Sequence, residues 1–144
     1  MAFESNFLFP DTLRYHLVNR RLGPSQADGV LRIYAGSKPG NMDTFDPSLH
    51  TSNELATFTS VILLDDTGNK WLYMDPLPST TISQSGTASW YALHTSSGSG
   101  TGESFAIIGD VSNELGDGTL KLLSTSLTSG NTVQLQSFYI KIFS

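Results

Sequence analysis

The chain of 144 residues contains no cysteine. A disulfide framework and a thiolate metal site are therefore both excluded. Charged side chains are also scarce, at 15% of the residues, where about 25% is usual in a globular domain. The 8 Lys and Arg are outnumbered by 13 Asp and Glu, which gives a formal net charge of -5. Because nucleic-acid binding requires clustered cations, this balance argues against a nucleic-acid partner.

Long hydrophobic runs are missing as well. No apolar stretch approaches the ~20 residues that a membrane-spanning helix needs. Residues 1–10 lack the basic segment of a secretory signal, and their apolar stretch covers only residues 7–9. We therefore expect no membrane association, and a chain that is made and folded in a cytoplasm.

Uncharged Ser, Thr and Asn take the place of the missing charges, which suits exposed β-sheet faces better than exposed helices. The 13 Gly and 6 Pro supply frequent turn points. Between them lie short strand-like segments at residues 30–35, 55–64, 71–74, 80–83, 86–94, 103–109, 119–123 and 132–143, with a hairpin turn at 65–69. This pattern predicts an all-β fold, namely an antiparallel β-sandwich of about seven to eight strands. The sequence shows no repeat or linker, so we expect residues 1–144 to form a single domain.

Residues 11–22 carry the one convincing helical pattern in the chain. Asp11 is a good N-cap, and Leu13 and Leu17 follow at helical spacing. A Gly-Pro pair then ends the segment. We predict a short N-terminal helix here, preceded by an N-terminal arm at residues 1–10.

The N-terminal arm holds a cluster of large apolar side chains, namely Phe3, Phe7, Leu8 and Phe9. Apolar patches that stay exposed in globular proteins tend to be contact surfaces. These four residues are therefore the candidate partner contact of the chain, to be buried in the domain or against another protein.

The segment 86–94 is predicted to be a central strand, because its aromatic pair is flanked by small residues. Side chains alternate between the two faces of a strand. One face would then hold Ala88, Trp90, Ala92 and His94, and the other Ser89, Tyr91 and Leu93. The pattern leaves open which of the two faces points inward.

The last strand contains an irregularity in its apolar pattern. Val133 and Leu135 have one parity, whereas Phe138 has the other. One extra residue near Gln136 and Ser137 would keep both sets facing the core. This change of parity predicts a β-bulge at that point.

Residues able to carry chemistry are few and scattered. The histidines, His16, His50 and His94, lie in no nucleophile motif and at no metal-ligand spacing. Oxygen ligands of the kind that calcium uses occur at residues 65–69 and 110–117, but neither stretch has the spacing of an EF-hand. We therefore predict no catalytic residue, no cofactor site and no metal site, and a protein that is not an enzyme.

Short motifs occur in a defined order along the chain: GVLRIYAGSKP (29–39), LATF (55–58), GTASWY (86–91), GDV (109–111), LKLLSTS (120–126) and GNTVQLQSF (130–138). This order resembles a family of small tailed-phage proteins encoded among virion structural genes, whose motifs include LRIYxGxxP, GTAxWFR and GxxVxVxSF. Ala92 departs from the pattern, because the family often has Arg there.

The resemblance implies a non-enzymatic virion component that is assembled in the host cytoplasm. The leading hypothesis is a head decoration (cement) protein on the capsid, with the major capsid protein as partner. Such proteins are often homo-oligomers, and a trimer at local threefold points is favoured. Phe3, Phe7, Leu8 and Phe9 would then make the anchoring contact.

Two other functions remain open from the sequence. One is a neck, tail or fibre-associated protein of the same particle, which would make ring contacts with neck or tail proteins. The other belongs to a different class, a carbohydrate-binding module that uses Trp71, Trp90 or Tyr91 on an exposed face. It requires that these rings are not buried.

Overall fold

The structure is a computed structural model that describes residues 2–4, 29–39, 47–66, 68, 71–95 and 106–141. The predicted helix at 11–22 lies outside these residues. The strands are β1 (Ala2–Glu4), β2 (Gly29–Ala35), β3 (Glu54–Val61), β4 (Leu63–Asp66), β5 (Trp71–Met74), β6 (Ser79–Thr81), β7 (Gly86–Thr95), β8 (Ala106–Asn113), β9 (Leu120–Leu122), β10 (Ser126–Leu127) and β11 (Thr132–Lys141). The helical turns within the described ranges are two short 3-10 segments, Pro47–Leu49 and Thr51–Asn53, so the predicted all-β class is confirmed. Nothing helical in these ranges has the length and apolarity to cross a membrane.

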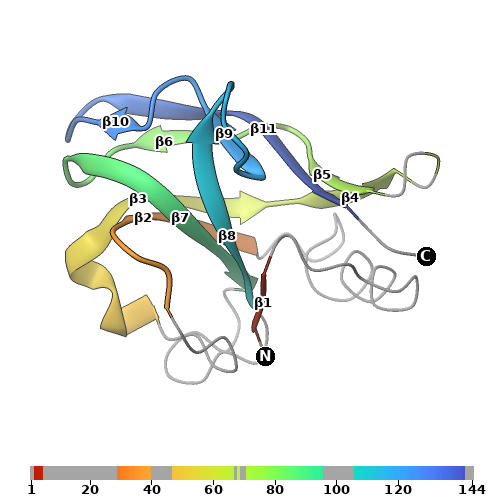
Figure 1. Ribbon diagram of the computed structural model, residues 1–144, viewed down its shortest axis with the longest axis horizontal. Helices are drawn as coiled ribbons and strands as arrows, with labels where there is room; N and C mark the ends of the chain where they lie inside the picture. The colour runs from red at the N-terminus through yellow and green to blue at the C-terminus, as the bar shows by residue number, and fades with distance from the viewer. Residues whose placement is uncertain are drawn as a thin grey trace.

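The strands form one sheet that curls into a nearly closed barrel (Figure 1). Its hydrogen-bonded path runs β3-β2-β7-β8-β9-β11-β5-β4, so β3 and β4 lie at opposite ends. These two strands are nevertheless consecutive in the chain and are separated only by Ile62. One continuous piece of chain therefore joins the two ends of the sheet. Within β3, Ser60 is the extra residue where the register against β2 shifts between Gly29 and Val30, and it has a left-handed φ of 57°.

The predicted antiparallel sandwich is wrong, because the sheet is mixed and forms one curved layer. Both β1 and β9 pair with β8 in parallel, with Phe3 opposite Ile107 and Ser112 opposite Lys121. The turn-rich segment after β8 therefore brings the chain back to start β9 in the same direction as β8.

At Gly118 the returning chain passes so close to β8 that a Cβ atom would lie 2.7 Å from the carbonyl oxygen of Asp110. Only glycine fits this approach.

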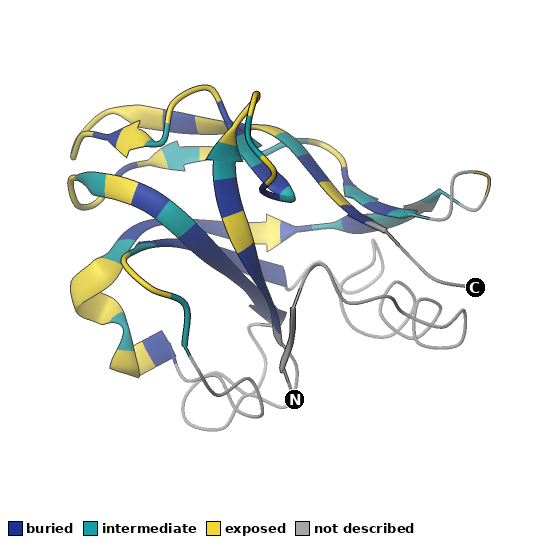
Figure 2. Ribbon diagram, viewed as in Figure 1, coloured by how far each residue is buried: buried dark blue, intermediate teal, exposed yellow. Residues whose placement is uncertain are grey.

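The main core consists of buried aliphatic and aromatic residues from every strand of the path. Figure 2 shows the buried positions along these strands in dark blue. The largest fully buried members of this main core are Leu31, Ile33, Leu55, Phe58, Tyr91 and Phe138. A smaller apolar cluster lies on the other side of β2, β7 and β8 and consists of Tyr34, Trp90, Ala92 and Ile108. Both faces of the central strand are thus buried, which answers the question that the alternation pattern left open.

The predicted bulge in the last strand is confirmed. The register of β11 against β9 shifts between Leu135 and Ser137. As a result Leu135 and Phe138 both lie in the main core, each with 1% of its surface exposed. The extra residue thus allows the apolar side chains before and after the bulge to face the same core.

A second bulge lies in β7 and was not predicted from the sequence. It changes which side chains share a face of this strand. The register of β7 against β2 shifts between Tyr34 and Ala35, where Ser89 is the additional residue. The Ser89 hydroxyl donates a hydrogen bond to the carbonyl oxygen of Gly36 on the neighbouring strand end. Ala88 is therefore in the main core with Tyr91 rather than on the face of Trp90.

The register shift at Ser60 provides a test of backbone strain in β3. A β-branched residue in the left-handed region is disfavoured by ~1–2 kcal/mol, so Ser60→Val should lower the free energy of unfolding by about that amount. The matched control is Thr59→Val at the exposed neighbouring position, which should change it by less than ~0.5 kcal/mol. Urea unfolding measures both, and equal midpoints for the two variants would contradict backbone strain at Ser60.

Candidate functional site

The N-terminal arm was the predicted partner contact, and the structure describes only its first strand. Phe3 lies in β1, where it is paired with Ile107 of β8. Phe7, Leu8 and Phe9 lie outside the described residues. The backbone of β1 thus adds to the chain's own sheet beside the lower end of β8 (Figure 1).

A polar cluster ties β2, β3 and β7 together on the side of the smaller apolar cluster. The guanidinium of Arg32 donates from Nη1 to Glu54 Oε1 at 2.6 Å and from Nε to His94 Nε2 at 3.2 Å. The Thr57 hydroxyl also donates to the Glu54 carboxylate. His94 is 1% exposed, and because its Nε2 accepts a hydrogen bond, the ring is neutral with its proton on Nδ1.

Aromatic rings continue this arrangement along the same strands. Tyr34 and Trp90 stack with their ring centroids 4.1 Å apart and their planes at 16°. The ring of His50 meets both edge-on, at 5.8 Å from Tyr34 and 5.3 Å from Trp90. Burial raises the pKa of the Tyr34 phenol, and the nearby charge of Glu54 raises this pKa further. The phenol therefore stays protonated as part of the packed cluster.

This polar and aromatic cluster fixes the register of three strands. The Arg32 guanidinium in β2 is bonded to the Glu54 carboxylate in β3 and to the His94 ring in β7. His50 and His94, far apart in sequence, both lie at this cluster, whereas His16 is outside the described residues. In the part of the chain that the structure describes, no three of His, Asp and Glu gather closely enough to hold a metal ion.

Three of the oxygen-bearing side chains in the segments considered for calcium, those of Asp66, Asp110 and Asn113, make local contacts. Asp66 accepts a hydrogen bond from Trp71 Nε1 at 3.0 Å across the β4–β5 hairpin, and this hairpin confirms the predicted turn. Asp110 forms an ion pair with Lys38 at 3.0 Å. Asn113 accepts a hydrogen bond from the backbone of Leu115 at 3.0 Å, which shapes the turn after β8.

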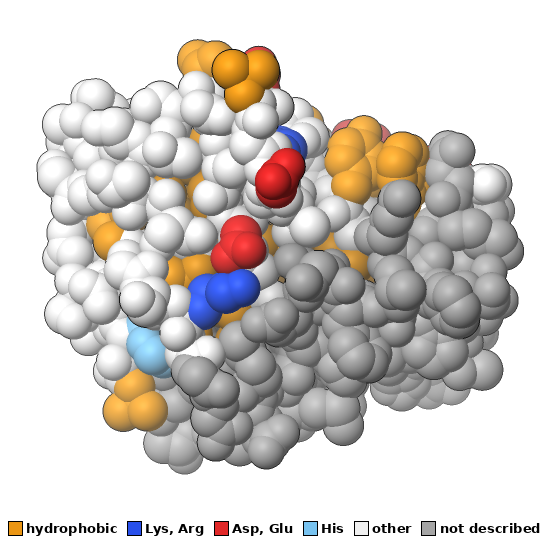
Figure 3. Space-filling view, viewed as in Figure 1, with side chains coloured by type: hydrophobic (Ala, Val, Ile, Leu, Met, Phe, Trp, Pro, Cys, Tyr) orange, Lys and Arg blue, Asp and Glu red, His pale blue; other side chains and the backbone are white. Residues whose placement is uncertain are grey.

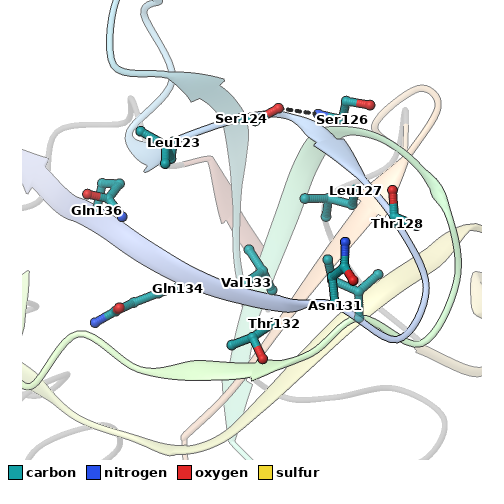
Figure 4. A pocket seen from close by; sticks show the side chains of 11 residues that line it. Leu123, Ser124, Ser126, Leu127, Thr128, Asn131, Thr132, Val133, Gln134 and Gln136 are labelled. Carbon is teal, nitrogen blue, oxygen red and sulfur yellow. Dashed lines mark hydrogen bonds between the residues drawn. The ribbon is translucent and has the colours of Figure 1, made fainter.

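A hollow of about 330 Å³ opens beside β11 (Figure 4). Its floor is apolar and consists of the buried residues Ile82, Leu127 and Val133. Its rim is made of hydroxyl and amide side chains with one exposed leucine, namely Leu123, Ser124, Ser126, Thr128, Asn131, Thr132, Gln134 and Gln136. None of the lining residues is charged, and we refer to this feature as the β11 hollow.

The β11 hollow exists because two neighbouring strands diverge. β9 is paired with β11 as far as Leu122 opposite Leu135. The chain then leaves β11, and β10 pairs with β7 through Ser126 opposite Thr87. A turn centred on Gly130, with a φ of 92°, brings the chain back into β11. The opening between β10 and β11 is therefore closed at both ends.

An aromatic pair lies at the other end of β11. The rings of Trp71 and Tyr139 are 4.7 Å apart and tilted by 41°. Tyr139 is 45% exposed, and the orange region over β5 and β11 in Figure 3 lies in this part of the surface. Trp90 and Tyr91, by contrast, are buried at 1% and 0% exposure, so these two rings cannot form the exposed platform that the carbohydrate-binding alternative requires.

A third surface feature is an apolar tip where β8 and β9 end. Leu115 is 95% exposed and Leu123 is 75% exposed. Two orange groups at the top of Figure 3 stand above the ends of these strands. The loop that carries Leu115 is held by a hydrogen bond from Gly118 N to Ser112 Oγ at 3.0 Å, and Lys121 Nζ donates to the same hydroxyl at 3.3 Å. We call Leu115 and Leu123 the leucine tip.

Sequence reasoning missed the candidate surfaces of β11 and the leucine tip. A signal for the first was present, because Thr132, Gln134 and Gln136 alternate with apolar residues in the last strand. The leucine tip had no such signal, because Leu123 continues the apolar pattern of the preceding strand and was assigned to it.

Comparison with known proteins gives no identification. No family model matches the chain, and no similar protein was found among the curated proteins or the solved structures.

The cross-strand ion pair can be tested by a double-mutant cycle. Glu54→Met leaves the Arg32 guanidinium partly buried without its carboxylate and should lower the free energy of unfolding by ~2 kcal/mol. Arg32→Met with Glu54→Met should cost less than the sum of the two single variants. The exposed pair supplies the control, because Lys38→Met should cost under ~1 kcal/mol. Additive costs of the Arg32 and Glu54 variants would show that the two side chains do not act together.

Proposed function

We propose that this chain is a non-enzymatic structural protein of a tailed-phage particle, and that it serves as a head decoration protein. The observation that carries the proposal is the leucine tip, in which Leu115, on a loop fixed by hydrogen bonds, and Leu123, just after β9, are both exposed. An apolar group held in place before contact loses little conformational entropy on binding, which favours protein–protein association. The order of motifs that resembles virion proteins supports the phage setting.

The wider surface also suits this role. A shell protein must cover and join subunits without attracting nucleic acid, and this chain combines few charges with an acidic balance. Its β-barrel is stabilised by an apolar core without disulfides. The leucine tip would contact the major capsid protein or a second copy in a trimer, and the N-terminal arm would add a further contact through Phe3, Phe7, Leu8 and Phe9. Interfaces of this kind bury ~1,200–2,000 Å² in total.

Copy number in the purified particle tests the location. Quantitative mass spectrometry beside electron microscopy should find hundreds of copies on the shell for a decoration protein. About six to a few dozen copies at one vertex would move the chain to the neck, tail or fibre, where rings or threefold fibres are expected. Absence from the particle would overturn both assignments.

Substitution of the leucine tip tests the contact itself. Leu115→Ser with Leu123→Ser should reduce binding to capsids that lack the protein at least tenfold, because the apolar contact is lost. Leu49→Ser is the matched control, since Leu49 is also exposed, at 76%, but belongs to a different loop. Occupancy measured by quantitative gel analysis of sedimented capsids should stay normal for this control. Full occupancy of the double variant would exclude the leucine tip as the contact.

Deletion of residues 1–10 tests the N-terminal arm separately. The truncated chain should bind capsids with reduced occupancy, because the apolar cluster of the arm is removed. Circular dichroism of the isolated protein must show that the barrel remains folded. Normal occupancy of a folded truncated chain would remove the arm from the contact.

A further inference from the structure

We infer that the outer face of β11 is a binding site for a neutral oligosaccharide, which extends from the β11 hollow to the Trp71–Tyr139 pair. The outward residues of this strand are Thr132, Gln134, Gln136, Ser137 and Tyr139. The bulge at Gln136 places two consecutive residues on this side, so the row continues past it. At ~3.3 Å per residue the row is roughly 20 Å long, enough for several sugar residues in line.

The uncharged, hydrogen-bonding side chains of this row favour a neutral ligand that is rich in hydroxyl groups. Gln134 and Gln136 are exposed, and neither side chain makes a hydrogen bond within the described part of the chain. A carboxamide offers both donors and acceptors, which match the vicinal hydroxyls of a sugar. No Lys, Arg or His lines the β11 hollow, so an anionic ligand such as a phosphate or an acidic glycan would find no countercharge there. Farther along the row Lys121 lies opposite Ser137, and its ammonium group donates to the Ser112 hydroxyl and to the Gly116 carbonyl.

The floor and the aromatic end supply the apolar part of recognition. Sugars present a C–H face beside their hydroxyls, and this face can pack on Ile82, Leu127 and Val133 at the bottom of the β11 hollow. At the other end it can stack on the exposed ring of Tyr139. The hydrogen bond from Trp71 Nε1 to Asp66 fixes the neighbouring indole, so the platform is formed before the ligand arrives.

This inference is independent of a place in the particle. The leucine tip and the row on β11 share Leu123, which stands at the rim of the β11 hollow, whereas Leu115 does not line the hollow. Leu115→Ser alone should therefore weaken capsid binding and leave glycan binding intact, and the reverse holds for variants of Gln134 and Tyr139.

The experiment uses the full chain and four neutral probes, namely maltohexaose, cellohexaose, laminarihexaose and xylohexaose. Isothermal titration calorimetry should detect at least one of them with a dissociation constant in the millimolar range or tighter. Tryptophan fluorescence should change on binding through Trp71, because Trp90 is buried. The same change should be absent in Trp71→Phe.

Variants identify the site. Gln134→Ala with Gln136→Ala, and separately Tyr139→Ala, should each weaken binding about tenfold. Thr59→Ala changes an exposed residue of β3 away from the row and should leave binding unchanged. Thermal unfolding confirms that each variant is folded. The inference is overturned if none of the neutral probes binds, if the β11 variants bind as the unmodified chain does, or if only an acidic oligosaccharide such as hexagalacturonate binds.

Discussion

One stretch of chain, from Glu54 to Asp66, provides both end strands of the sheet, and the architecture depends on this constraint. Because only Ile62 separates β3 from β4, the sheet has to curl until its two ends meet. The gap near β3 is further sealed by a backbone hydrogen bond from Ser83 to Leu55 at 2.8 Å. The interior enclosed in this way receives side chains from every strand of the path, which allows a chain without disulfides to bury a continuous core.

The candidate surfaces arise where regular strand pairing stops. The β11 hollow forms where β10 leaves β11 for β7, and the leucine tip stands where β8 and β9 end. The Trp71–Tyr139 pair lies at the opposite end of β11 from the hollow. The paired regions, by contrast, are either packed on the core or joined by the Arg32 cluster. The paired strands thus act as a scaffold, and the groups available for recognition lie where strand pairing stops.

Local features of this fold could be predicted from the sequence, whereas long-range pairings could not. The β4–β5 hairpin follows from a turn of Asp, Gly and Asn, and the β11 bulge from the parity of Leu135 and Phe138. The bulge at Ser89 depends on the carbonyl of Gly36 across the sheet, which no local pattern reveals. For the same reason the parallel pairing of β9, the short strands β1 and β10 and the closure of the barrel were missed. Of the candidate surfaces, Trp71 was identified, and the amides of β11 were visible as alternation but not interpreted.

The continuity of β3 and β4 also determines the order in which the fold can be completed. β2 and β3 leave the ribosome early, but β7, the other neighbour of β2, follows only after the β4–β5 hairpin and β6 have been made. β5 waits longer still, because its second neighbour is β11 near the end of the chain. Pairings between such distant segments close slowly, and until then the apolar sides of the early strands face solvent. The barrel can therefore be completed only after β11 has been made, and until then part of its apolar interior lacks its partner strands.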